Sequence, residues 1–305
     1  MTQEQDRIWT IRGLMKSAIS HLQKRGFDEA RLNVELLLAH ALRCRRIELY
    51  SNFQRSLTQE EVGEFFLLYE RRLKHEPVQY ILGATSFMGL QMKVDPRVLI
   101  PRPETETLVE QTMIACNNFA SGGKIHILEI GTGSGNIAIA LAKYVKNVRV
   151  TSIDNSPTAL DVARMNIREH GLESTVELRE MNIFEPMDQL LLRRFDVLVS
   201  NPPYVPPDEW ETLRPEVKNY EPKNAATDSE DGFEFYRRIF ELAPYLLVDR
   251  GLALVEVGDG CAKEVEELMN QNGLEEISIA PDLQGTNRVV IGLCRSKSRN
   301  PSFSN

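Results

Sequence analysis

The chain of 305 residues is poor in the residue types that build disulfide and metal frameworks. Its four cysteines, Cys44, Cys116, Cys261 and Cys294, are scattered and form no C-x-x-C pair, and its five histidines are equally dispersed. We therefore expect no disulfide framework, no structural zinc and no other metal site. A reducing, cytoplasmic location fits this cysteine usage best.

Long apolar runs are also missing. No stretch approaches the ~20 apolar residues that a membrane span needs. The N-terminus contains Glu4 and Asp6 and lacks a basic start followed by an apolar run, so we expect no secretory signal. Hydrophobic residues make up 42% of the chain and charged residues 26%, which is close to the globular average and excludes wholesale disorder.

An excess of positive charge is absent as well, since the formal net charge is −8. Residues 1–90 contribute 13 basic and 11 acidic residues, and the other 215 contribute 23 and 33. A general nucleic-acid binder should carry a basic stripe, so we expect no nucleic-acid partner. We interpret the basic clusters Arg43–Arg46 and Arg71–Lys74 as solvated helix faces, with partner docking as the alternative.

The N-terminal part of the chain has the apolar spacing of helices. Apolar residues recur three or four positions apart over 11–22 and over 32–42, which is the period of one helix face. Thr58 followed by Glu61 forms a capping box and predicts that another helix starts there. We therefore expect a small helical bundle domain over residues 1–85.

The pattern then changes to short β-like runs at 86–88 and 90–94, separated by a glycine turn signal. These runs predict a hairpin, and we expect residues 86–103 to form a β-hairpin linker between two domains. Prolines on both sides of Arg102 then prevent a helix until Glu104, where one can start.

From residue 125 onward the chain alternates between strands and helices. The candidate strands are 125–130, 148–153, 176–179, 195–200, 252–257, 276–280 and 288–294. Helical stretches separate the first six, and this alternation implies a parallel sheet covered on both faces. The last two are joined only by residues 281–287, too few for a helical crossover, so they should pair antiparallel. Over 104–295 we predict an α/β, doubly wound, Rossmann-like sheet of seven strands with the last one antiparallel, followed by a polar tail at 296–305.

A glycine-rich loop follows the first of these strands. It consists of Gly131, Thr132, Gly133, Ser134 and Gly135. Glycines at alternate positions let the backbone approach a ligand closely. The dinucleotide fingerprint needs its third glycine at position 136, where this chain has Asn136. The loop therefore predicts a ligand site of another type, with a plain tight turn as the alternative.

Polar residues end the next two strands. The carboxyl ends of adjacent parallel strands face one crevice, so Asp154 can accept hydrogen bonds from both hydroxyls of a ribose. Its alternative role is to cap the helix that starts near Ser156. After the third strand, Asn182 can bond an adenine amine while Ile183 and Phe184 pack on the base. The alternative is an ordinary loop residue followed by core side chains.

The motif after the fourth strand favours one chemistry. It reads Asn201-Pro202-Pro203-Tyr204, and its two prolines remove two amide donors. The Asn201 side-chain oxygen and the Pro202 carbonyl then leave a pocket rich in acceptors, with the Tyr204 ring beside them. Such a pocket suits a planar –NH₂ group, whose two protons need two acceptors. We therefore expect these four residues to be catalytic.

Taken together, these motifs resemble class I S-adenosylmethionine-dependent methyltransferases that act on exocyclic or amide nitrogens. The closest resemblance is to the release factor glutamine methyltransferase family, and it spans residues 10–295. Further segments that carry it are Pro77–Gly83, Leu99–Glu106, Glu221-Pro222, Asp231-Gly232, Glu256–Gly258 and Asp282–Gly285 with Arg288. The Pro101–Glu106 segment separates it from the similar ribosomal-protein glutamine methyltransferases. The chain departs from the family pattern at Asn182, commonly acidic, and at Cys261, often glutamine.

The resemblance implies a cofactor, a substrate and further site residues. The cofactor would be S-adenosyl-L-methionine, with Glu129 and the glycine loop at its methionine portion, Asp154 at the ribose, Asn182 and Ile183 at the adenine, and Asn201 beside it. The substrate would be the glutamine of the Gly-Gly-Gln motif in class-1 peptide chain release factors, docked with help from the N-terminal domain. We expect the enzyme to be a monomer.

Two alternatives remain open. The –NH₂ pocket also suits an enzyme that methylates adenine amines in nucleic acid, although the net charge and the Pro101–Glu106 segment oppose this. A catalytically silent adaptor that only senses S-adenosylmethionine would have no need of the motif at Asn201–Tyr204. Asn136 disfavours a nicotinamide-dependent oxidoreductase.

Overall fold

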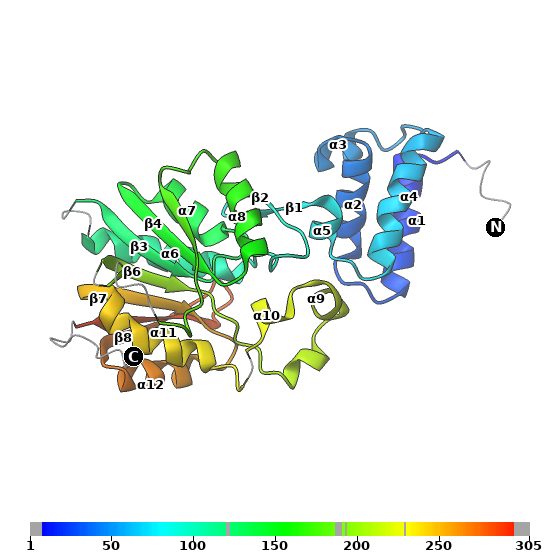
Figure 1. The fold of residues 1–305 in the computed structure, drawn as a ribbon. Helices are drawn as coiled ribbons and strands as arrows, with labels where there is room; N and C mark the ends of the chain where they lie inside the picture. The colour runs from blue at the N-terminus through cyan, green and yellow to red at the C-terminus, as the bar shows by residue number, and fades with distance from the viewer. Residues whose placement is uncertain (1–7, 120–122, 187–190, 193, 229, 296–305) are drawn as a thin grey trace. The chain divides into compact units, whose positions relative to one another are not determined.

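The computed structural model describes most of the chain (Figure 1). The described residues are 8–119, 123–186, 191–192, 194–228 and 230–295. The chain divides into two compact units, one of Met1–Gly83 with Pro215–Tyr220 and one of Ala84–Arg214 with Glu221–Asn305. The polar tail expected at 296–305 lies outside the described residues.

The first unit is the predicted helical bundle. Its helices are α1 (Ile11–Lys24), α2 (Ala30–Ala41), α3 (Arg46–Ser51), α4 (Gln59–Leu73), α5 (Val78–Leu82) and α9 (Pro215–Tyr220). Leu14, Leu38 and Phe65 are fully buried between them. The predicted capping box is present, because the Thr58 side chain accepts from the Glu61 amide and the Glu61 carboxylate accepts from the Thr58 amide.

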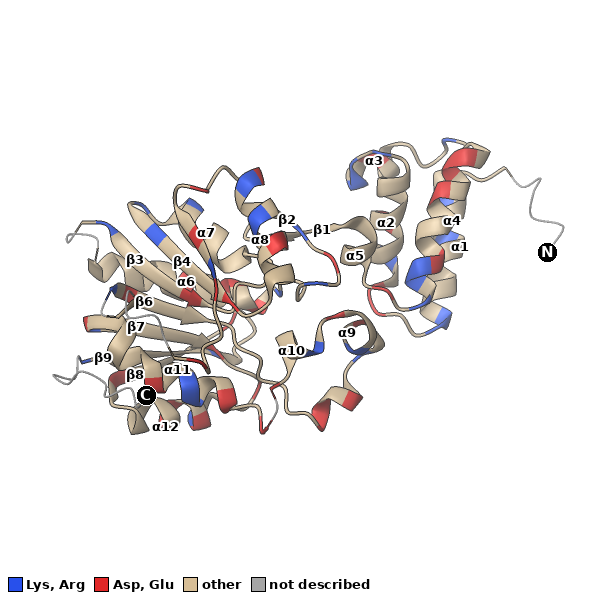
Figure 2. Cartoon of the chain, in the orientation of Figure 1, with Lys and Arg blue, Asp and Glu red and all other residues tan. Residues whose placement is uncertain are grey.

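One of the expected solvated residues is instead buried. The Arg72 side chain is 6% exposed, and its Nη2 lies 2.7 Å from Glu216 Oε1. Its guanidinium also lies 4.5 Å from the centre of the Phe27 ring, and its Nε donates to Asn33. The interpretation of a solvated face was wrong at this position, although Figure 2 shows both signs of charge elsewhere on α4. Arg72 ties α9, distant in sequence, to α2 and α4 of the same unit.

The second unit begins with the predicted hairpin. Strands β1 (Ala84–Phe87) and β2 (Leu90–Lys93) pair antiparallel. The Lys93 amide donates to Asn166 Oδ1 at 2.7 Å, and Asn166 lies on α8 (Pro157–Glu169). The hairpin therefore packs on the body of this unit. Helix α6 (Glu104–Cys116) starts at the predicted residue.

The sheet has the predicted seven strands. They are β3 (Ile125–Ile130), β4 (Val148–Asp154), β5 (Val176–Glu180), β6 (Phe195–Ser200), β7 (Leu247–Glu256), β8 (Leu274–Pro281) and β9 (Asn287–Cys294). Their order is β5-β4-β3-β6-β7-β9-β8, and β9 runs antiparallel to both of its neighbours, as predicted for the last strand. Strand β7 starts at Leu247 instead of 252. The helical stretch expected between β5 and β6 falls partly on residues outside the described ranges.

Helices cover both faces of this sheet (Figure 1). Ile127 and Val197 pack in a core with α6, α7 (Asn136–Tyr144) and α8, whereas their neighbours Leu128 and Leu198 pack in a second core with α11 (Glu234–Leu246) and α12 (Ala262–Gln271). Because both faces are buried, apolar side chains extend from both sides of the central strands. The shorter elements are η1 (Asn117–Phe119), η3 (Glu209–Thr212) and α10 (Lys223–Ala226). Within the described ranges, no helix combines the length and apolar character that a membrane crossing requires.

Candidate active site

A cavity of about 380 Å³ lies at the carboxyl ends of the parallel strands in the second unit. Its volume is within the usual range for small-molecule sites. The predicted site residues that line it are Gly131, Thr132, Gly133, Ser134, Asp154, Asn182, Ile183, Asn201, Pro202 and Pro203. Glu129, Gly135 and Tyr204, which we also predicted, do not line it. The loops after four parallel strands thus come together as the predicted topology requires.

Gly133 and Gly135 of the loop have different structural roles. Gly133 has a φ of 52°, no heavy atom lies within 4 Å of a Cβ built there, and its amide donates to Asp154 Oδ2 at 2.9 Å. Gly135 is the N-cap of α7 with a φ of 82°, and a Cβ there would lie 3.3 Å from the Ala163 side chain. The second glycine therefore keeps the backbone open toward the cavity, and the third allows α7 and α8 to pack closely.

The Asp154 carboxylate organises the two loops on either side of it. Besides Gly133, it accepts from the Ser156 amide at 2.9 Å. Ser156 is the N-cap of α8 and its side chain accepts from the Ala159 amide, so the capping role that we considered for Asp154 belongs to Ser156. Burial raises the pKa of Asp154, against the lowering effect of these amides. A carboxylate has about four acceptor sites, so two remain for a ligand.

Glu129 lies behind the glycine loop and is completely buried. Its Oε2 accepts from the Ser152 hydroxyl, whose oxygen lies 2.7 Å from Thr132 Oγ1. Its Oε1 has no hydrogen-bond partner among the described residues. Burial raises the pKa of Glu129 to about 8. An unpartnered buried carboxyl oxygen beside this loop fits a cationic ligand group, which would favour the charged form.

Some polar groups of the residues after β5 already form hydrogen bonds within the protein. Asn182 Oδ1 accepts from the Phe184 amide at 3.1 Å, while the Asn182 residue lines the cavity. Ile183 is buried, and its carbonyl accepts from Arg238 Nε at 2.7 Å. Phe184 is 42% exposed and packs edge-on against Phe235. Contact of this loop with an adenine ring stays a prediction.

The residues after β6 present acceptors to the cavity. Asn201 Nδ2 donates to Thr105 Oγ1 at 3.1 Å, so its Oδ1 remains an acceptor. Pro202 and Pro203 line the cavity and have no amide hydrogens to offer. Tyr204 is directed elsewhere: its hydroxyl donates to Glu256 Oε1 at 3.4 Å, and burial raises its pKa.

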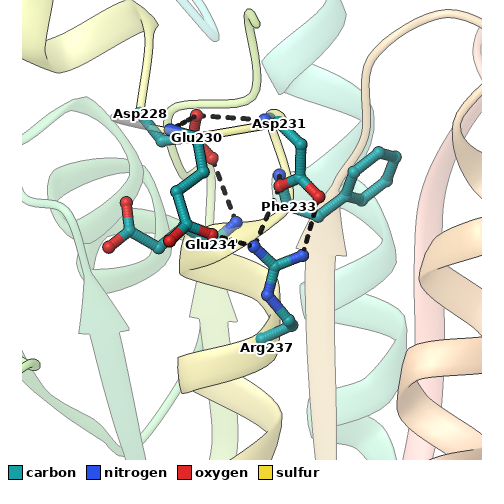
Figure 3. Close-up of polar contacts among 7 residues, drawn as sticks. Asp228, Glu230, Asp231, Phe233, Glu234 and Arg237 are labelled. Atoms are coloured by element: carbon teal, nitrogen blue, oxygen red, sulfur yellow. Dashed lines mark hydrogen bonds and ion pairs between the residues drawn. The ribbon is translucent and has the colours of Figure 1, made fainter.

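Two glycine segments fit around Tyr204. Gly232 has a φ of 84°, and a Cβ there would lie 2.7 Å from the Tyr204 carbonyl oxygen. The Gly232 amide donates to Asp228. Asp228 also accepts from the Glu234 amide at the start of α11 (Figure 3). Arg237 pairs with the acidic residues of the same turn. A Cβ on Gly258 would come within 3.1 Å of the Tyr204 ring. The two glycines therefore let these segments pack closely against the backbone and the ring of Tyr204.

Comparison with known proteins identifies the family. Residues 14–83 match the model of the PrmC N-terminal domain, and residues 121–274 match a methyltransferase domain. The chain is 41% identical over 289 residues to the release factor glutamine methyltransferase of Geobacter sulfurreducens, covering 95% of this chain and 98% of that protein. The chain belongs to the release factor glutamine methyltransferase family. It is therefore an enzyme, a methyltransferase.

A second relative supports the family assignment, and a solved structure supports the fold. The chain is also 41% identical over 271 residues to the release factor glutamine methyltransferase of Chlorobaculum tepidum, covering 88% of this chain and 92% of that protein. Among solved structures, the catalytic domain of hMettl16 in complex with a MAT2A 3′UTR hairpin aligns with a TM-score of 0.54 over 81% of this chain and 88% of that one. That structure is only 14% identical, so it supports the fold alone.

The methyltransferase has site residues to which the sequence assigned no role. Arg102 lines the cavity, and its Nη2 lies 2.6 Å from Glu221 Oε1. The other Glu221 oxygen accepts from the Ile100 amide at 3.3 Å. Thr105 also lines the cavity and accepts from Asn201 Nδ2. Glu256 accepts from the Tyr204 hydroxyl, and burial raises the pKa of Glu256 to about 7. All lie in segments that carried the family resemblance, but nothing in their spacing indicated which of them meet.

Proposed function

We propose that this enzyme transfers a methyl group from S-adenosyl-L-methionine to the side-chain amide nitrogen of the glutamine in the Gly-Gly-Gln motif of class-1 peptide chain release factors. The main support for the proposal is that this part of the cavity lining offers hydrogen-bond acceptors and no backbone donors. Asn201 Oδ1 is available as an acceptor, and the two prolines that follow have no amide hydrogens. The names of relatives that cover nearly the whole chain support the choice of a release factor.

The glycine loop and its neighbours fit the cofactor. The two open acceptor sites of Asp154 suit the ribose hydroxyls. The Glu129 carboxyl, which lies behind the glycine loop and outside the cavity lining, would favour the positive charge of the methionine ammonium through space. Asn182 and Ile183 line the part of the cavity that would take the adenine. When bound, S-adenosyl-L-methionine supplies a methyl group on a positively charged sulfur, which is an electrophile.

The residues after β6 would prepare the substrate. A carboxamide nitrogen is a poor nucleophile because its lone pair is delocalised into the carbonyl. Asn201 Oδ1 and the Pro202 carbonyl can each accept one amide proton and leave the nitrogen facing the methyl group. Holding reactants in line contributes up to ~7–11 kcal/mol in ideal cases. The two acceptor dipoles also stabilise positive charge that develops on nitrogen.

This chemistry needs no strong general base. An N-methylated, N-protonated amide is very acidic and loses its proton readily. We further propose that residues 1–85 help to dock the release factor, because the residues lining the cavity all belong to the second unit.

The test is to incubate the enzyme with labelled S-adenosyl-L-methionine and purified release factors and to map the modified peptide by mass spectrometry. We expect one methyl group on the Gly-Gly-Gln glutamine. A release factor with alanine at that glutamine is the control and should stay unlabelled. Label on another residue, or label only on nucleic acid with a steep loss of binding at high salt, would refute the proposal.

A further inference from the structure

One peptide group beside the cavity is hydrogen-bonded through both its carbonyl and its amide. It joins Ile183 to Phe184 in the loop after β5. The carbonyl accepts from Arg238 Nε at 2.7 Å, and the amide donates to Asn182 Oδ1 at 3.1 Å. A peptide group whose two polar atoms are both bound cannot turn without giving up a hydrogen bond, so its orientation is fixed.

Arg238 reaches this loop from α11. Its Nη2 donates to the Glu185 carbonyl at 3.4 Å, and its Nη1 pairs with Glu241 of the same helix at 2.7 Å. The planar guanidinium thus presents donors in a fixed geometry to two carbonyls of one loop. Arg238 is not among the described residues that line the cavity, so it would act on a ligand through the loop.

The same face of α11 supports the loop through a second contact. Phe235 precedes Arg238 by three residues, and residues three apart are neighbours on a helix surface. The Phe235 ring packs edge-on against Phe184, with 5.1 Å between the ring centres, and Phe235 lines the cavity. The Ile183 side chain is buried in the core that α11 shares with the sheet. Loss of Arg238 should therefore loosen the backbone of the loop without unfolding it.

We propose that Arg238 is a positioning residue for cofactor binding, because it fixes the loop that would contact the adenine of S-adenosyl-L-methionine. The inference rests on the proposed function. Asn182 and Ile183 both line the cavity, and both belong to the hydrogen-bonded unit that Arg238 completes. Without the guanidinium the Ile183 carbonyl loses this donor, and the peptide group can turn and take the Asn182 side chain with it.

The experiment uses the full-length enzyme and two arginines that are adjacent on α11. Arg238→Met removes the guanidinium and keeps an apolar side chain, and Arg238→Lys keeps the charge. Arg237→Met is the matched control for cofactor affinity, because Arg237 pairs with Glu230 and Asp231.

Four measurements are made on each variant after thermal unfolding has shown that it is folded. Calorimetry gives the affinity for S-adenosyl-L-methionine, and competition gives the affinity for adenosine, which lacks the methionine part. Hydrogen exchange without ligand follows the Phe184 and Glu185 amides, which both donate to Asn182. Single-turnover methylation of a release factor is measured at saturating cofactor.

We expect Arg238→Met to weaken binding of S-adenosyl-L-methionine roughly 5- to 20-fold, since a hydrogen bond to a charged group is worth about tenfold or more. Adenosine affinity should fall by the same factor, because the loop would contact only the adenine. The Phe184 and Glu185 amides should exchange faster than in the wild type. The single-turnover rate should stay close to the wild-type value, because saturating cofactor compensates for weaker binding. Arg238→Lys should bind with intermediate affinity, and Arg237→Met should bind as the wild type does.

Three results would overturn the inference. Folded Arg238→Met could bind the cofactor with wild-type affinity, Arg237→Met could lose as much affinity, or cofactor affinity could fall while adenosine affinity stays unchanged. If Arg238→Met does not fold, Arg238→Lys is compared with Arg237→Met in the same way. Failure of the proposed function gives a different result, because the wild-type enzyme itself would then bind no S-adenosyl-L-methionine or leave the release factor unmethylated.

Discussion

Replacing Asp154 tests the cofactor site most directly. Its carboxylate accepts from the Gly133 and Ser156 amides, both at 2.9 Å. Two acceptor sites remain, which we assign to the ribose. Hydrogen bonds to charged groups contribute about 1.5–3 kcal/mol, so Asp154→Ala should weaken S-adenosyl-L-methionine binding roughly 10- to 150-fold, at 1.4 kcal/mol for each factor of ten.

The same substitution should also reduce stability, and the two effects must be separated. Loss of the Gly133 and Ser156 contacts is partly offset, because the environment that raises the pKa of Asp154 also disfavours its charge. We therefore expect a modest cost of about 1–3 kcal/mol in the free energy of unfolding. Asp154→Asn should be intermediate, because its oxygen can still accept from Ser156 while its –NH₂ group cannot accept from Gly133.

Calorimetry of cofactor binding, on protein shown to be folded by thermal unfolding, measures the outcome. Asp161→Ala is the matched control, since Asp161 is exposed on α8 and its carboxylate pairs with Arg164 at the surface. It should bind the cofactor as the wild type does. If folded Asp154→Ala also binds with wild-type affinity, the ribose role is wrong and Asp154 serves only to join the two loops.

Three further predictions concern other parts of the molecule. Asn201→Ala should lower kcat at least on the order of 10²-fold, with Asn201→Asp between it and the wild type; single-turnover methylation at the wild-type rate would exclude the amide clamp. Burial raises the pKa of Glu129 to about 8, so the folded protein keeps this proton at pH values where the unfolded chain has already released it, above about 4.5. The free energy of unfolding of the ligand-free protein should therefore fall as pH rises from about 5 to 8, by up to about 1.4 kcal/mol per pH unit. Glu129→Gln should remove this part of the slope in thermal unfolding, and an unchanged slope would contradict the assignment. Deleting residues 1–83 should raise KM for intact release factor far more than the cofactor Kd, and equal losses in protein that stays folded would refute the division of labour.

Local sequence pattern was enough to predict the elements. Apolar runs bounded by turn residues gave β3 and β6 at their observed bounds, and the Thr58 capping box marked the start of α4. The short 281–287 connection predicted the antiparallel final pair. These features depend on neighbours in the chain, so the sequence contains them directly. Strand β7 was predicted to start late because its first residues include exposed charges.

Tertiary structure alone decided which distant side chains meet. Thr105 and Asn201 are 96 residues apart, and Arg102 and Glu221 are 119 apart. No periodicity connects such pairs, because each contact depends on how a helix or loop packs against the carboxyl end of the sheet. The sequence by itself determined that acceptors, glycines and an acidic residue would gather at that edge. Packing decided that Tyr204 turns toward Glu256, that Glu129 lies behind the glycine loop, and that Arg72 is buried against α9.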